Sequence, residues 1–293
     1  HVSQHGGPFK PLDGGVALSR YYRLLDNISS HSQDQNYDSH DRFFAQAKLE
    51  FGQGKFHDET ERKILESMMS RDPNVQKLIR QMFEPKDYFM VRDRMIGSGS
   101  IGGKACGMLL ARKIADECLP EFRDHSEPHD SFFIGSDVYY TYIVNNNCWK
   151  LRVEQRTREG FFTKAPALRE ALLHGEFSEQ IREQFKSMLS YYGQTPIIVR
   201  SSSFLEDGFG NAFAGKYESV FCVNSGSLDE RLKQFEQAVR TVYASTMDPS
   251  ALEYRVQRGL EKLDEQMSIL VQRVSGSWAG PYYLPGAAGV GFS

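Results

Sequence analysis

The stretch Pro196–Ser203 reads PIIVRSSS, and it is followed by FLEDG (Phe204–Gly208) and then NAFAGKYES (Asn211–Ser219). Its apolar start, Pro196–Val199, predicts a short buried strand, because an unbroken apolar run suits a strand covered on both faces. The strand would carry Arg200 and three serines to its C-terminal end, the edge where open α/β sheets bind ligands. We therefore expect the fold to be organised around this strand.

A loop of small residues follows, and a second strand is predicted over Tyr217–Val223. The small residues are Gly208, Gly210, Ala212, Ala214 and Gly215. Backbone N–H groups in such a loop can approach a ligand closely, and a guanidinium at its entrance forms bidentate charge-assisted bonds. The pattern predicts a polyphosphate site. The alternative is a surface hairpin in which Arg200 pairs with Glu206 or Asp207.

The order of these residues resembles a known nucleotide-binding domain. Arg200-Ser201-Ser202, the pair Glu206-Asp207 and the run Phe213–Ser219 are similar to the ATP-binding domain of the pyruvate phosphate dikinase and phosphoenolpyruvate synthase family. The resemblance implies an ATP-grasp-like fold of the α/β (α+β) class, with ATP and Mg2+ as cofactors. With weaker motifs it extends from about Ile96 to Ser293.

The composition excludes several other classes of protein. Of the 293 residues, 40% are hydrophobic and 25% charged, which is ordinary for a soluble globular protein. A net charge of −3 without a basic stripe argues against nucleic acid as a partner. No apolar run is long enough for a membrane span, and the N-terminus lacks a signal-peptide pattern. The four scattered cysteines form no CxxC pair, so we expect no metal-binding residues and a cytoplasmic location.

Residues 1–90 predict a helical N-terminal extension without a chemical motif. Apolar residues recur at helical spacing over Ala17–Ile28, and further helical patterns cover Asp41–Phe51 and Asp58–Phe83. The last pattern is expected to break near Asp72-Pro73, because proline cannot continue a helix. The nucleotide-binding domain is then predicted over residues 91–293, incomplete at its C-terminus.

A glycine-rich turn, Ile96–Lys104, opens a helix that is predicted to end before Pro120. A turn of this kind at a helix N-terminus can bind an anion, because unpaired N–H groups and the helix dipole point at the ligand. The resemblance implies that Lys104 contacts ATP phosphates. The simplest alternative is an exposed lysine at a helix start.

Two further interpretations of this turn compete. Gly97, Gly99 and Gly102 fit the G-x-G-x-x-G dinucleotide pattern, but that pattern requires a preceding strand, and a charged segment is expected there. A P-loop is excluded, because Ser98 replaces the first glycine and Ala105 replaces the hydroxyl residue after the lysine.

The C-terminal part predicts further elements of the domain. Ser227 and Glu230 form a capping box before a helix. A strand is predicted over Met267–Val274, a turn region over Ser275–Gly286 and a closing strand over Ala287–Phe292. The resemblance implies that the strand over Met267–Val274 is the hinge strand, with Gln272, Arg273 and Val274 bordering the adenine.

The resemblance also implies which residues bind the nucleotide and which act in catalysis. Lys104 would hold the phosphates, and Arg200 would stabilise charge on the transferring group; both are the implied catalytic residues. The implied nucleotide-binding residues are Lys104, Arg200, Ser201, Ser202, Gly208, Gly210, Ala214, Gly215, Gln272, Arg273 and Val274.

No phosphorylatable-histidine segment and no pyruvate-binding barrel are found in the sequence. The implied activity is therefore that of one part of a larger phosphotransferase. It would cleave ATP and pass a phosphoryl group to a histidine on a domain absent here, and then to pyruvate or another acceptor. One alternative is a non-catalytic ATP-sensing or partner-binding module, and another is a dinucleotide-dependent oxidoreductase. The sequence is also compatible with a homo-oligomer.

Overall fold

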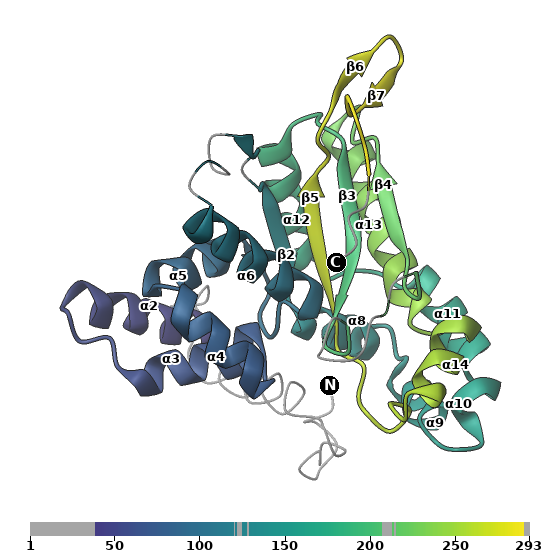
Figure 1. Ribbon diagram of the computed structural model, residues 1–293. Helices are drawn as coiled ribbons and strands as arrows, with labels where there is room; N and C mark the ends of the chain where they lie inside the picture. Colours follow the sequence, from purple (N-terminus) through teal and green to yellow (C-terminus); the bar gives the residue numbers. More distant parts are fainter. Residues whose placement is uncertain are drawn as a thin grey trace.

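A computed structural model describes residues 39–119, 121, 125–127, 129–206, 213 and 215–289. Its centre is a mixed five-stranded sheet in the order β1-β2-β5-β3-β4 (Figure 1). The first pair runs parallel and the other neighbours are antiparallel. The strands are β1 (Met95–Ile96), β2 (Ser131–Ile134), β3 (Ile197–Ser203), β4 (Ser219–Cys222) and β5 (Met267–Arg273).

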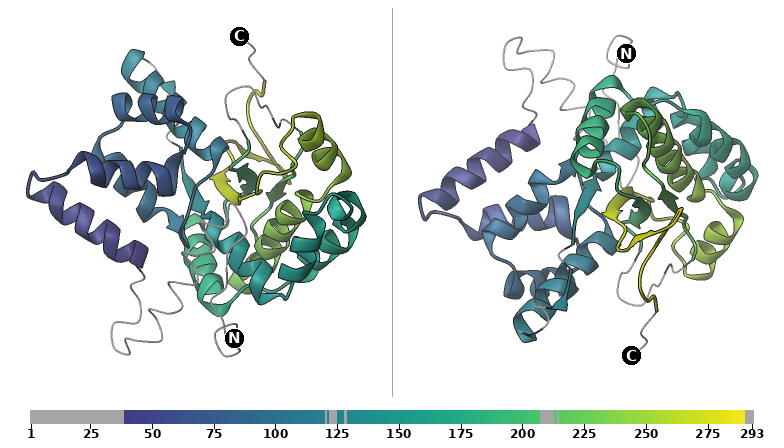
Figure 2. Two further views of the ribbon diagram at one scale, coloured as in Figure 1. Left: turned by 90° about the horizontal axis from the view of Figure 1, so that it is seen from below. Right: turned by 90° about the horizontal axis from the view of Figure 1, so that it is seen from above.

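Helices cover both faces of the sheet (Figure 2). The alternation of strand side chains explains this: on β5, Ile269 and Val271 enter one core, whereas Leu270 enters the other. The first core packs against α8 (Ser136–Asn145), α9 (Trp149–Gln155), α10 (Gly160–Thr163), α11 (Ala165–His174), α12 (Glu179–Tyr192), α13 (Leu228–Ser245) and α14 (Pro249–Gln257). The second core packs against α6 (Gly103–Cys118) and the N-terminal helices.

The N-terminal region is helical as predicted. It contains α2 (Ser39–Gly52), α3 (Asp58–Ile64), the π-helical turn η2 (Leu65–Met69), α4 (Pro73–Met82) and α5 (Pro85–Asp93). The expected break is confirmed: the Asp72 carboxylate caps α4 by accepting from the next turn's N–H groups, with Pro73 in the first helical position. The helix predicted over Ala17–Ile28 lies outside the described residues. The proposed boundary after residue 90 falls within α5.

The structure corrects four local predictions. A two-residue strand, β1, does precede Gly97, at the edge of the sheet. β3 does not end at Arg200, because its three serines continue the pairing with β5 as far as Ser203↔Met267. The predicted turn region contains a hairpin of β6 (Ser277–Ala279) and β7 (Tyr282–Leu284), which projects beyond the sheet (Figure 1). The described part of the predicted closing strand, 287–289, is not a strand.

The fold class is confirmed as mixed helix and sheet with a helical N-terminal region, consistent with an ATP-grasp-like nucleotide-binding domain. The capping box of Ser227 and Glu230 at the start of α13 is also confirmed. All four cysteines lie within the described residues and are unpaired. Among the described helices, none is long and apolar enough to cross a membrane.

Candidate nucleotide site

Lys104 lies in the first turn of α6 and reaches the C-terminal end of β3. Its Nζ donates to the Ser201 carbonyl oxygen at 2.9 Å, to Ser201 Oγ at 3.0 Å and to Glu206 Oε1 at 2.9 Å. The side chain is 22% exposed, whereas the Glu206 side chain is 2% exposed. The lysine is therefore held at the end of β3 rather than extended into solvent.

Close packing of glycines brings these two segments together. A Cβ on Gly102 would lie 1.6 Å from the Ser202 carbonyl oxygen, and one on Gly103 would lie 1.8 Å from the Glu206 carbonyl oxygen. Gly102 also has φ +83°, a conformation that favours glycine. The glycines before Lys104 are thus needed for contact between α6 and the end of β3.

Ser202 supplies the N-terminal cap that α6 lacks in its own sequence. Its Oγ accepts from the Ala105 N–H at 2.9 Å and donates to the Ile101 carbonyl oxygen at 2.8 Å. A helix start leaves several N–H groups without helical partners, and a hydroxyl commonly satisfies one of them. Both Ser201 and Ser202 are fully buried, and their hydroxyls are bonded within the protein.

Arg200 lies on the other side of β3 from Ser201 and contacts the predicted hinge strand. Its Nη1 donates to Gln272 Oε1 at 3.3 Å. The Gln272 amide in turn donates to Met108 Sδ on α6 at 3.1 Å. In the β3–β5 register Gln272 pairs with Ile198, and Ser201, which holds Lys104, pairs with Ile269. Lys104, Arg200 and Gln272 therefore follow one line along the sheet, roughly 10 Å long.

The other two predicted hinge residues are separated from this line. Arg273 points away from Gln272 and is bound by Asp130, with Nε···Oδ2 2.8 Å and Nη2···Oδ2 2.7 Å. Its Nη1 donates to Thr195 Oγ1 at 3.0 Å. The Val274 N–H donates to the Pro196 carbonyl oxygen at 3.0 Å, so this amide is also engaged.

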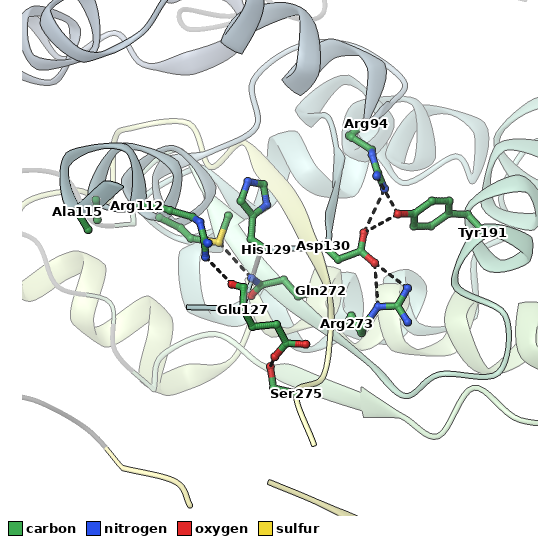
Figure 3. A pocket seen from close by; sticks show the side chains of 12 residues that line it. Arg94, Arg112, Ala115, Glu127, His129, Asp130, Tyr191, Gln272, Arg273 and Ser275 are labelled. Atoms are coloured by element: carbon green, nitrogen blue, oxygen red, sulfur yellow. Dashed lines mark hydrogen bonds and ion pairs between the residues drawn. The ribbon is translucent and has the colours of Figure 1, made fainter. Parts of the chain in front are cut away.

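A pocket of about 890 Å³ lies at the Gln272 end of the line (Figure 3). Arg94, Arg112, His129 and Asp130 are among the residues that line it. Asp130 joins Arg94 to Arg273, since its Oδ1 lies 3.2 Å from Arg94 Nη1. Burial, followed by the charge of Arg112, lowers the pKa of His129 below its usual value of 6.5, so this imidazole is neutral at neutral pH.

The predicted phosphate loop is described only in part. Gly208, Gly210 and Ala214 lie outside the described residues. Gly215 has φ +68°, with open space around the position of a Cβ. The loop is followed by Tyr217, whose hydroxyl donates to the fully buried carboxylate of Glu265.

Two acidic residues near the site were not predicted. Glu206 pairs with Lys104, not with Arg200 as the hairpin alternative assumed. Glu265 lies just before β5 and is 0% exposed. No spacing in the sequence could have indicated either contact, because the partners lie far apart along the chain and meet only through the sheet.

The acidic side chains near Lys104 bear on whether a metal ion could bind there. Within the described ranges, no group of three or more His, Cys, Asp or Glu side chains gathers to hold a metal ion. Both oxygens of Glu206 already accept hydrogen bonds, from Lys104 and Ser201 on one side and from the Ser203 N–H on the other.

A glycine-rich helix start with a lysine in its first turn, beside a strand that carries an arginine, is typical of domains that can bind phosphate groups. Comparison with models of protein families identifies the family of this domain. Residues 98–293, more than half of the chain, match the model described as pyruvate phosphate dikinase, AMP/ATP-binding domain. The chain therefore belongs to this family, and its matched part is an ATP-binding domain. A search of curated proteins finds no significant match.

Proposed function

We propose that this chain is the ATP-binding part of a phosphotransferase of the pyruvate phosphate dikinase type, with Lys104 and Arg200 as its phosphate-binding and catalytic residues. The family match over residues 98–293 supports the proposal, together with the order of Lys104, Arg200 and Gln272 along the sheet. The cations Lys104 and Arg200 suit the phosphates, because charge-assisted bonds to phosphate are among the strongest in proteins.

The base would lie at the other end, in the pocket beside Gln272. The Gln272 amide and the neutral His129 offer uncharged donors and acceptors to a purine. A cavity of about 890 Å³ is within the range of small-molecule sites. Arg273 and Val274 would border the base; Arg273 lines the pocket, and its side chain is held by Asp130.

Catalysis would depend on positioning and on electrostatic stabilisation. Arg200 would stabilise negative charge that develops on the transferring phosphoryl group, while Lys104 holds the phosphates in place. The phosphoryl group would pass to a histidine on a domain absent from these residues, and then to pyruvate or another acceptor. Magnesium and a cytoplasmic location remain predictions from the sequence, and so does the homo-oligomer.

The alternative of a non-catalytic ATP-sensing module uses the same site without turnover. A dinucleotide-dependent oxidoreductase is less well supported, because β1 before the glycine-rich turn is a two-residue strand at the edge of the sheet. A dinucleotide fold instead places this strand inside a parallel sheet.

Thermal unfolding with ATP and with NAD tests the proposal. A ligand that binds only the folded state raises the melting temperature. We expect a rise with ATP and none with NAD, and a much smaller ATP effect in Lys104→Ala. A rise with NAD alone would support the oxidoreductase, and equal ATP effects in both proteins would contradict the role of Lys104.

A further inference from the structure

The Lys104 ammonium has no hydrogen-bonding capacity left. An ammonium has three N–H donors, and Lys104 directs three hydrogen bonds to Ser201 and Glu206. A phosphate oxygen that approaches Lys104 must therefore replace at least one of these acceptors or share its donor.

Glu206 is the charged member of this set, and it is rigidly held without the lysine. Its Oε1 also accepts from Ser201 Oγ at 2.9 Å, and its Oε2 accepts from the Ser203 N–H at 2.7 Å. The Glu206 carbonyl lies against Gly103, where no Cβ would fit, so the backbone is fixed as well. The carboxylate can thus keep two donors if the ammonium turns away.

A second carboxyl group, that of Glu265, lies near Glu206. Glu265 is fully buried nearby. Its pKa is raised, first by burial and further by the charge of Glu206, although Arg255 and the hydrogen bonds from Tyr217 and Ser203 oppose this. Phosphates placed at Lys104 would add negative charge beside the Glu206 carboxylate, which Coulomb repulsion disfavours.

From this geometry we infer that Glu206 is a positioning residue that holds the Lys104 ammonium at Ser201 and competes with nucleotide phosphates for it. The inference rests on the proposed function, since it assumes that Lys104 meets ATP phosphates. The Glu206 contact sets the nucleotide affinity below the value that a free ammonium at this place would give.

The test is the affinity of the full chain for ATP and for inorganic tripolyphosphate, measured by titration calorimetry in wild type and Glu206→Gln. The amide can still accept from the Ser203 N–H, but it carries no charge to hold the ammonium. We expect Glu206→Gln to bind both ligands about five- to tenfold more tightly, whereas loss of a purely structural contact would weaken binding.

A double-mutant cycle with Lys104→Met measures how far the effect of Glu206 on ATP affinity depends on Lys104. If Glu206 acts through the lysine, Glu206→Gln has no effect on affinity in the Lys104→Met background. Glu236→Gln is a matched control, because Glu236 is also a buried glutamate, ion-paired to Arg182 and Arg240 on the other face of the sheet. It is expected to leave the affinity unchanged.

Should Glu206→Gln fail to fold, Glu206→Asp keeps the charge but shortens the side chain, and we expect tighter binding by a smaller factor. Unchanged or weaker binding in the folded variant would overturn the inference, and so would equal tightening without Lys104. If wild type binds neither ligand, the proposed function fails and the inference fails with it. Binding by wild type with no tightening in the variant rejects the inference alone.

Discussion

Gly102 contacts Ser202 so closely that a Cβ on the glycine would lie 1.6 Å from the serine carbonyl oxygen. This contact joins the glycine-rich turn to the Arg-Ser-Ser strand, two motifs far apart in the sequence. It fixes the start of α6, and with it Lys104, against the end of β3. The proposed phosphate site therefore depends on backbone packing between α6 and β3.

Gly102→Ala is expected to destabilise the protein by about 3 kcal/mol, because overpacking adds to the strain of a left-handed residue. Gly107→Ala in the exposed middle of α6 is the control: nothing lies within 4 Å of its Cβ position. Alanine favours helix there by about 0.8 kcal/mol. Denaturant unfolding of both variants measures the difference, and a tolerated Gly102→Ala would contradict the packing described.

Ser202→Ala should cost about 1–2 kcal/mol, because it leaves the Ala105 N–H without its cap in the interior. Ser227→Ala removes the comparable cap of α13, at the surface and away from the site. Both variants should lose stability, but only Ser202→Ala should also weaken ATP binding, since α6 carries Lys104. Equal ATP affinities of the two variants would show that the Ser202 cap does not influence ATP binding.

Glu265 predicts a pH dependence of stability. Burial is the main cause that raises the pKa of its carboxyl above the ordinary value of 4.5. A raised pKa in the folded state means that the contribution to stability is complete below pH 4.5 and is lost as the pH rises. The unfolding free energy of wild type minus that of Glu265→Gln should therefore fall from pH 4.5 towards neutral pH.

Glu183→Gln provides a control for which the opposite pH dependence of stability is expected. A hydrogen bond from Lys186 lowers the pKa of the exposed Glu183 carboxyl, so its small contribution grows with pH. Urea unfolding at several pH values gives both differences. A wild-type advantage over Glu265→Gln that increases with pH would show that Glu265 is ionised and paired in the interior.

Local patterns predicted the elements well. The apolar run before Arg200, the Asp72-Pro73 break and the Ser227–Glu230 box each depend on neighbouring residues, and the structure confirms them. The order of the Arg-Ser-Ser and Phe-Ala-Gly motifs identified the family. The prediction of a turn region after β5 missed two short strands. Aromatic residues in this region pair across the hairpin that these strands form.

Contacts between distant elements could not be predicted in the same way. The three serines were expected at an open edge, yet β5 extends beside them and buries them. The Lys104–Glu206 pair and the Arg200–Gln272 bond depend on the register of β3 and β5, which no local pattern specifies. The roles of all the predicted nucleotide-binding residues remain predictions.

We propose that Arg200 faces the nucleotide, whereas Arg273 has a structural role in its contacts with Asp130 and Thr195. Calorimetric titration of ATP into wild type, Arg200→Ala and Arg273→Ala tests it most directly. Among the described residues, Arg200 is bonded through its side chain only to Gln272, at 3.3 Å, whereas Arg273 is bound by Asp130 and Thr195. We predict that Arg200→Ala weakens ATP binding at least tenfold, about 1.4 kcal/mol, while Arg273→Ala lowers stability and changes affinity far less. Equal losses of affinity in the two variants would contradict the account.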